Sequence, residues 1–135
     1  MTEAIQTLFD QARQAQAEGR PADARNFYAQ AAALAREAGT PLLRAEALQH
    51  LSDLDREARR PVEALAHAEQ AAALYRRHAD TNDLGLTKAL RLTALALDDL
   101  GRGEAATALW TEARDRYAEA GIAAGVAECD RRLEG

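Results

Sequence analysis

The chain has 135 residues, of which 47% are hydrophobic and 29% are charged, with only three prolines. This length and composition exclude a disordered chain and predict a domain large enough to bury a hydrophobic core. The net charge of −5 argues against a nucleic-acid-binding surface, and no apolar run approaches the roughly 20 residues that a membrane span needs.

The N-terminus and the cysteine content narrow the localisation and the chemistry further. The first residues have no basic segment followed by an apolar core, so we expect no signal peptide. Cys129 is the only cysteine, which excludes an internal disulfide and a cysteine-based zinc site. These features predict a soluble cytoplasmic protein that does not act at a membrane.

The first predicted helix hairpin covers residues 3–39. Apolar residues recur three or four positions apart in both of its halves, which is the spacing of one helix face. The second helix is expected to begin at Pro21, because proline fits the first turn of a helix, and to end at Gly39, because glycine readily adopts the left-handed conformation found there. These apolar positions are Ile5, Leu8, Ala12 and Ala15, then Ala24, Phe27, Tyr28, Ala31 and Leu34.

Two further hairpins are predicted over residues 41–79 and 84–121. Thr40 and Asp83 are expected to cap the first helix of each, since both residue types accept hydrogen bonds from free backbone N–H groups. A turn is expected over residues 80–85. A last short helix over 123–133 is expected to cap the array.

The three predicted hairpins repeat one another in sequence. The stretch that begins at Gly19 aligns without gaps with a stretch that begins at Arg59, 40 residues later. A third stretch begins at Gly101, a further 42 residues along the chain. A fixed period of this length is the signature of a solenoid of stacked hairpins. Small side chains recur where helices of a hairpin would cross closely, namely Ala12, Ser52 and Ala94 in the first helices and Ala24, Ala64 and Ala106 in the second.

These turn and crossing positions resemble tetratricopeptide repeats (TPRs), specifically the longer variety of 40 to 42 residues found in bacterial regulators and kinesin light chains. The resemblance extends over residues 3–121. It implies an all-α fold in which three helix hairpins and a capping helix form a right-handed α-solenoid, with residues 1–135 as a single TPR-like domain. The first helices of such hairpins line a concave groove that holds an extended peptide or a partner helix.

The resemblance also implies which side chains face this groove. An apolar anchor surrounded by charges of both signs would suit a short amphipathic segment of a partner. Two alternatives stay open: Leu92 and Leu95 can instead pack against the neighbouring helix, and Phe9 can pack at the open first end of the array. The expected partner-binding residues are Phe9, Arg13, Gln49, His50, Asp53, Lys88, Arg91, Leu92 and Leu95.

One branch of the TPR family holds the C-terminal carboxylate of chaperones with a clamp of Lys, Asn and Arg side chains. Only Lys88 matches that pattern here. His50 stands where the clamp needs Asn, and Leu92 stands where it needs Arg. We therefore do not expect a chaperone-binding role.

The histidines are the candidates for catalysis. His67 aligns with apolar residues of the other two hairpins and is expected in the core. His50 has Glu46 one helical turn before it and Asp53 one turn after it, so a histidine–carboxylate pair could form. No nucleophile, second histidine or metal-binding spacing accompanies His50, and the sequence predicts no enzyme, no metal and no cofactor.

The sequence thus predicts a non-enzymatic scaffold or adaptor that binds a protein or peptide in its groove. Two alternatives stay open. One is a module that forms a homodimer through the open ends of the array, and the other is the sensing subunit of a bacterial regulatory system. An enzyme that uses His50 is a third and weaker alternative.

Overall fold

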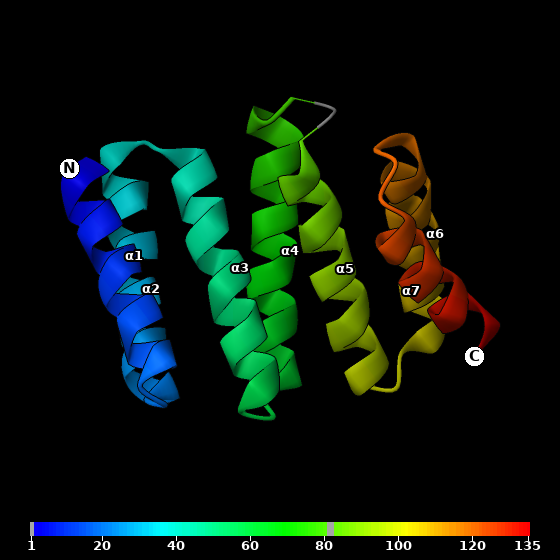
Figure 1. Cartoon of the computed structure of the whole chain (residues 1–135), viewed down its shortest axis with the longest axis horizontal. Coiled ribbons are helices and arrows are strands. Elements are labelled where there is room, and N and C mark those ends of the chain that lie inside the picture. The colour runs from blue at the N-terminus through cyan, green and yellow to red at the C-terminus, as the bar shows by residue number, and fades with distance from the viewer. Residues whose placement is uncertain (1, 81–82) are drawn as a thin grey trace.

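The computed structural model describes residues 2–80 and 83–135, which form seven α-helices and no strand. The helices follow one another as a row of antiparallel hairpins (Figure 1). This arrangement confirms the all-α fold predicted from the repeats. The helices are α1 (Thr2–Ala17), α2 (Pro21–Ala38), α3 (Pro41–Glu57), α4 (Pro61–His78), α5 (Leu84–Asp99), α6 (Gly103–Glu119) and α7 (Ala123–Glu134).

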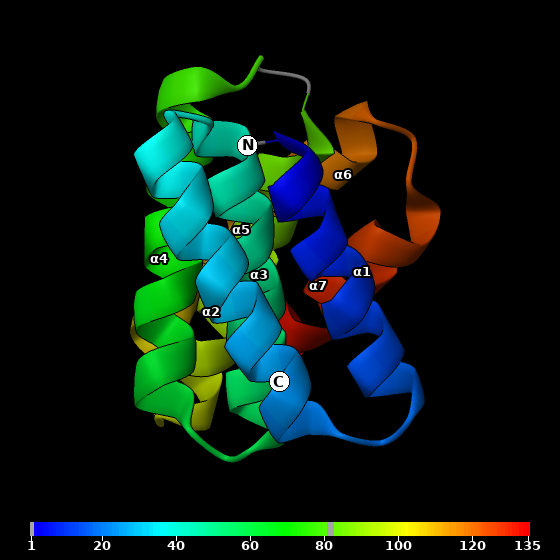
Figure 2. The same cartoon turned by 90° about the vertical axis from the view of Figure 1, so that its left-hand side faces the viewer.

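The hairpins stack in two layers. Each helix packs against the next along the chain, and α3 also contacts α5. Seen from the α1 end, α2 and α4 lie on one side of the molecule and α1 and α7 on the other (Figure 2). Within the described residues, no helix is both long enough and apolar enough to cross a bilayer. The structure is therefore an α-solenoid in which α7 follows the third hairpin.

Three of the helices begin with a proline. Pro21, Pro41 and Pro61 are the first residues of α2, α3 and α4, where the missing N–H costs no helical hydrogen bond. The prediction that Thr40 caps α3 through its side chain is wrong. Its hydroxyl instead donates a hydrogen bond of 3.2 Å to the carbonyl oxygen of Ala35, at the end of the preceding helix.

The start of α5 is capped as predicted. The carboxylate of Asp83 accepts a hydrogen bond of 2.6 Å from the backbone N–H of Gly85. The predicted turn over residues 80–85 includes Thr81 and Asn82, which lie outside the described residues.

The turns inside the three hairpins share one backbone shape. Gly19, Arg59 and Gly101 have positive φ angles of 71°, 61° and 73°. In each turn the next backbone N–H donates a 2.8 Å hydrogen bond to the carbonyl oxygen five residues earlier. Glycine adopts this left-handed conformation without strain, whereas a residue with a side chain adopts it at a cost of about 1–2 kcal/mol. The repeat in sequence is therefore a repeat in backbone geometry, with Arg59 as the strained copy.

The crossings inside the hairpins are made by the predicted small residues, all of them fully buried. In the second hairpin the hydroxyl of Ser52 donates a 2.9 Å hydrogen bond to the carbonyl oxygen of Ala64, directly across the crossing. Tyr28 and Trp110, the large residues predicted beside the crossings of the other two hairpins, are also buried. Close approach of the helices thus depends on residues too small to separate them.

Each hairpin also contains one polar contact between two side chains twelve positions apart. The contacts are Tyr28 to Gln16 at 3.1 Å, His67 to Asp55 at 2.6 Å and Trp110 to Asp98 at 2.9 Å. The prediction that His67 lies in the core is corrected by this geometry, because its side chain is 27% exposed and its Nδ1 faces the Asp55 carboxylate. Asp55 is the buried partner of this pair, with no exposed surface.

Asp55 also joins the first two hairpins. Its Oδ1 lies 2.7 Å from Nε of Arg25 on α2. The N–H group of Arg25 is not aligned with Oδ1, so this contact is a charge pair without a directed hydrogen bond. The equivalent positions of the other hairpins hold Ala15 and Leu97, which shows that the buried carboxylate belongs to this joint alone.

Candidate partner-binding groove

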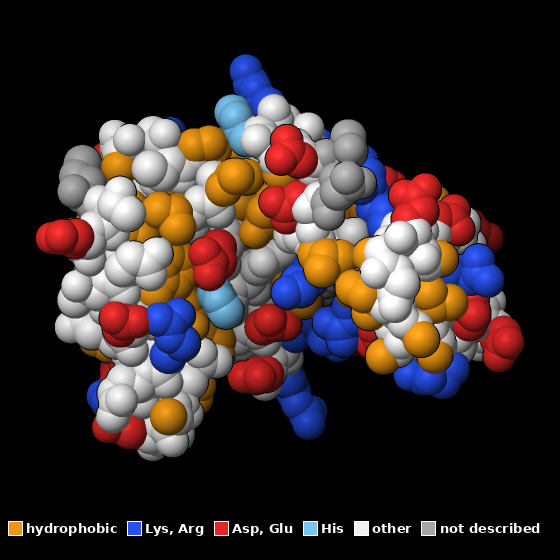
Figure 3. All heavy atoms as spheres, turned by 45° about the horizontal axis from the view of Figure 1, so that its top comes forward, with side chains coloured by type: hydrophobic (Ala, Val, Ile, Leu, Met, Phe, Trp, Pro, Cys, Tyr) orange, Lys and Arg blue, Asp and Glu red, His pale blue; other side chains and the backbone are white. Residues whose placement is uncertain are grey.

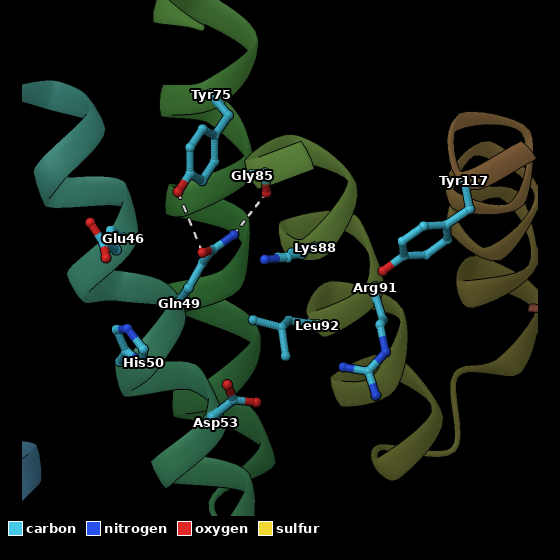
Figure 4. A pocket seen from close by; sticks show the side chains of 10 residues that line it. All are labelled: Glu46, Gln49, His50, Asp53, Tyr75, Gly85, Lys88, Arg91, Leu92 and Tyr117. Atoms are coloured by element: carbon cyan, nitrogen blue, oxygen red, sulfur yellow. Dashed lines mark hydrogen bonds between the residues drawn. The ribbon is translucent and has the colours of Figure 1, made fainter. Parts of the chain in front are cut away.

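A hollow of about 600 Å³ lies between α3 and α5, on the layer formed by the first helices of the hairpins. Side chains from four helices surround it (Figure 4). The lining residues are Glu46, Gln49, His50 and Asp53 from α3, Tyr75 from α4, Gly85, Lys88, Arg91 and Leu92 from α5, and Tyr117 from α6. We call this hollow the groove.

The two long walls of the groove carry opposite charges. Glu46 and Asp53 lie on α3, whereas Lys88 and Arg91 lie on α5. Lys88 extends across the groove toward α3 (Figure 4). In the space-filling view, acidic, basic and histidine side chains adjoin one another across the middle of the molecule (Figure 3). The groove therefore presents both signs of charge, as the sequence predicts.

Arg91 is already paired within the chain. Its guanidinium donates two hydrogen bonds, of 2.5 and 3.0 Å, to the carboxylate oxygens of Glu128 on α7. These hydrogen bonds raise the pKa of Arg91 and lower the pKa of Glu128. Lys88, in contrast, is exposed and makes no ion pair with the described residues. The free cation of the α5 wall is thus Lys88.

Gln49 holds three helices together at one end of the groove. Its amide nitrogen donates a 2.7 Å hydrogen bond to the carbonyl oxygen of Gly85, and its amide oxygen accepts one of 3.3 Å from the Tyr75 hydroxyl (Figure 4). Burial raises the pKa of Tyr75 to about 12, so this phenol stays protonated as a donor. Gln49 lines the groove as predicted, but its amide is bound inside the fold.

Tyr75 and Tyr117 line the groove in addition to the residues predicted from the sequence. Each ring lies against a glycine of the following helix: a Cβ at Gly85 would be 2.3 Å from the Tyr75 ring, and one at Gly125 would be 2.4 Å from the Tyr117 ring. The sequence signal for this pairing is a tyrosine at equivalent positions of two hairpins, each followed by a glycine near the start of the next helix.

The expected apolar anchors are buried. Phe9 is 1% exposed and packs edge-on against Tyr28, with ring centroids 5.8 Å apart. Leu95 is 2% exposed, and Leu92, on the floor of the groove, is 4% exposed. The expectation of an exposed apolar anchor is therefore wrong, and the alternative, that these side chains pack against neighbouring helices, holds for all three.

Arg13 lies outside the residues that line the groove. It is largely exposed on α1 and forms an ion pair with Asp10 one turn earlier on the same helix. The positive charge of Arg13 nevertheless lowers the pKa of His50.

His50 is a packing residue as well as a groove residue. Its ring stacks on Tyr28, with centroids 4.4 Å apart and planes 11° apart, and meets Phe9 edge-on at 6.2 Å. Burial lowers the pKa of His50, and the charges of Arg13 and Lys88 lower it further. His50 is therefore neutral near pH 7 and makes no hydrogen bond to a carboxylate among the described residues.

Asp53 faces the groove from the α3 wall, one helical turn after His50. Partial desolvation by its surroundings raises the pKa of this carboxyl group, and the charge of Arg91 opposes the rise. Among the described residues neither Asp53 nor Glu46 forms an ion pair, and no group of three metal-ligating side chains is present. The groove thus holds two carboxylates that make no ion pair with the described residues.

Stacked hairpins that cross through small residues and leave a groove on their first helices define a TPR-like helical repeat. A solved TPR-like protein from Chlorobium tepidum TLS has the same fold: it superposes with a TM-score of 0.81 over 98% of this chain and 94% of that chain, at 19% sequence identity. No protein-family model and no curated protein matches the sequence.

Proposed function

We propose that this chain is a non-enzymatic adaptor that binds a segment of another protein in the groove between α3 and α5. The observation that carries the proposal is the set of charged groups left without partners on the walls of that hollow. Glu46, Asp53 and Lys88 form no ion pair with the described residues. A bound segment could satisfy these groups directly by placing an opposite charge beside each of them.

The state of the groove side chains supports binding over catalysis. A general base needs a pKa near the working pH and a free path to substrate. The raised pKa of Tyr75 keeps its phenol protonated, and the stacked ring of His50 is engaged with Tyr28. A volume of about 600 Å³ is within the range of ligand sites and suits a short peptide segment.

A peptide selection tests this proposal. A random 12-residue library displayed on phage is selected against the intact protein, and enriched peptides are synthesised and titrated by fluorescence anisotropy. Asp53→Trp fills the groove and is expected to weaken binding at least tenfold. Glu63→Trp, at an exposed position near the start of α4 and outside the groove, is the matched control and is expected to leave binding unchanged.

Two results would contradict the proposal. Either the selection enriches no peptide, or the enriched peptides bind equally well to Asp53→Trp. Sedimentation velocity across a concentration series tests the alternative of a homodimer, since a strict monomer removes it.

A further inference from the structure

The leucine and tyrosine side chains that line the groove are buried and offer a partner no exposed apolar anchor. Leu92 is 4% exposed, and Tyr75 and Tyr117 are each 7% exposed. Burial of apolar area contributes roughly 25 cal/mol for each Å² removed from water, so side chains already this buried add little to binding. Charged and polar contacts are left to decide which segment the groove accepts.

The unpaired charged groups of opposite sign lie on opposite walls of the groove. Glu46 and Asp53 belong to α3, and Lys88 belongs to α5, whereas Arg91 is bound to Glu128. On the α5 side the Tyr117 hydroxyl also lines the groove and makes no hydrogen bond to the described residues. One wall therefore offers carboxylates that need a cation, and the other offers donors that need an anion.

We infer that the occupant is a polar protein segment of mixed charge, which places a basic side chain beside Asp53 and Glu46 and an acidic side chain beside Lys88. This inference rests on the proposed function and adds the chemistry of the partner. Two acids against one free base favour a segment with more basic than acidic residues. Arginine suits the α3 wall best, because its planar guanidinium can bond two carboxylate oxygens at once.

The placement of opposite charges on the two walls gives these pairs their discriminating power. Asp53 is held in surroundings that raise the pKa of its carboxyl group, so a cation beside it stabilises the charged form. A segment with the charges reversed would bring like charges together on both walls. Such contacts are repulsive, so the reversed segment is rejected.

A charge-exchange experiment tests the inference with the phage-selected peptides described above. Peptides enriched on the wild-type protein are expected to contain at least one basic and one acidic residue. Replacing the critical Arg or Lys of such a peptide with Glu is expected to weaken binding to the wild type at least tenfold. The same Glu peptide is expected to recover at least part of that loss on Asp53→Lys, but not on the control Glu63→Lys.

The outcomes separate this inference from the proposed function. Enriched peptides that are apolar or carry a single sign of charge would overturn the inference and leave the groove as a binding site. The same conclusion follows if Asp53→Lys fails to recover binding of the Glu peptide. A selection that enriches nothing would overturn the proposed function and the inference with it.

Discussion

The joint between the first and second hairpins differs from the joint between the second and third. At the first joint, the rings of Phe9, Tyr28 and His50 meet between α1, α2 and α3, and the charge pair of Arg25 with the fully buried Asp55 lies beside them. Rings of this kind remove large apolar areas from water and fix their neighbours by shape.

At the second joint, two of the side-chain contacts that cross between hairpins are partly exposed ion pairs. Surface pairs of this type contribute about 0–1 kcal/mol each and weaken with salt. They join α3 to α5 and α4 to α6, as Arg56–Asp99 at 2.7 Å and Arg76–Glu112 at 2.7 Å. The hydrogen bond from Gln49 to the Gly85 carbonyl oxygen crosses here too, so the groove lies at a polar joint, whereas the first joint is aromatic.

The largest expected effect comes from removing the central ring of the aromatic joint. Tyr28→Ala is expected to lower the free energy of unfolding by about 3–5 kcal/mol, because it leaves a cavity among fully buried groups. Urea denaturation measures this change. Tyr28→Phe is the control and is expected to cost about 1 kcal/mol, since it loses only the hydrogen bond to Gln16. An equal cost for both variants would mean that the ring does not hold the joint.

The buried carboxylate of the same joint gives the next effect. Arg25→Met is expected to cost about 2 kcal/mol, less than for a fully buried pair because Arg25 is about one-third exposed. The double variant with Asp55→Leu is expected to recover most of the loss, because Leu97 occupies the equivalent position of the third hairpin. If the double variant is less stable than Arg25→Met in urea denaturation, the carboxylate stabilises the fold by itself.

The pH dependence of the aromatic joint is smaller. The pKa of His50 is lowered below 6.5 in the folded chain, so the unfolded chain binds the proton more readily. The contribution of His50 to stability is therefore complete above about pH 6.5 and falls as the pH drops toward its folded pKa. Thermal melting between about pH 8 and pH 5 should show a steeper loss for the wild type than for His50→Phe. Parallel curves would contradict this assignment.

The ion pair between α5 and α7, Arg91–Glu128, is expected to respond least. Glu128→Gln is expected to lower stability by about 0.2–1 kcal/mol at low salt and by less at about 1 M salt. Chemical denaturation by urea at both salt concentrations measures the difference. The change also frees Arg91 in the groove, so acidic peptides should bind the variant more tightly than the wild type. A stability loss as large as that of Arg25→Met would mean that this partly exposed pair is not weaker than the pair with the buried Asp55.

The elements that the sequence predicted well are those set by local chemistry. Proline at the first helical position and glycine with positive φ act within a few residues, so Pro21 and Gly39 mark the ends of α2 correctly. The recurring alanines predicted where the helices cross, because only small side chains allow two helices to approach each other closely. Thr40 failed as a cap because the carbonyl oxygen of the preceding helix competes for its hydroxyl.

The groove was harder to predict because it depends on contacts between hairpins. Helical spacing shows that Phe9 and Leu95 lie on a given face, but not whether the next hairpin covers that face. His67 aligns with apolar residues yet faces a carboxylate that only the second hairpin carries. The charged residues of α3 and α5 were predicted to face the groove, because the resemblance assigns exposed positions on the first helix of each hairpin to the groove.

The two tyrosine–glycine contacts set the position of each ring against the backbone of the following helix. No methyl group fits between Tyr75 and the helix at Gly85, so a side chain added there would displace the ring and break its link to Gln49. A side chain added at Gly125 would displace the Tyr117 ring in the same way. The shape of the groove lining can therefore be changed at either glycine without altering any of its charges.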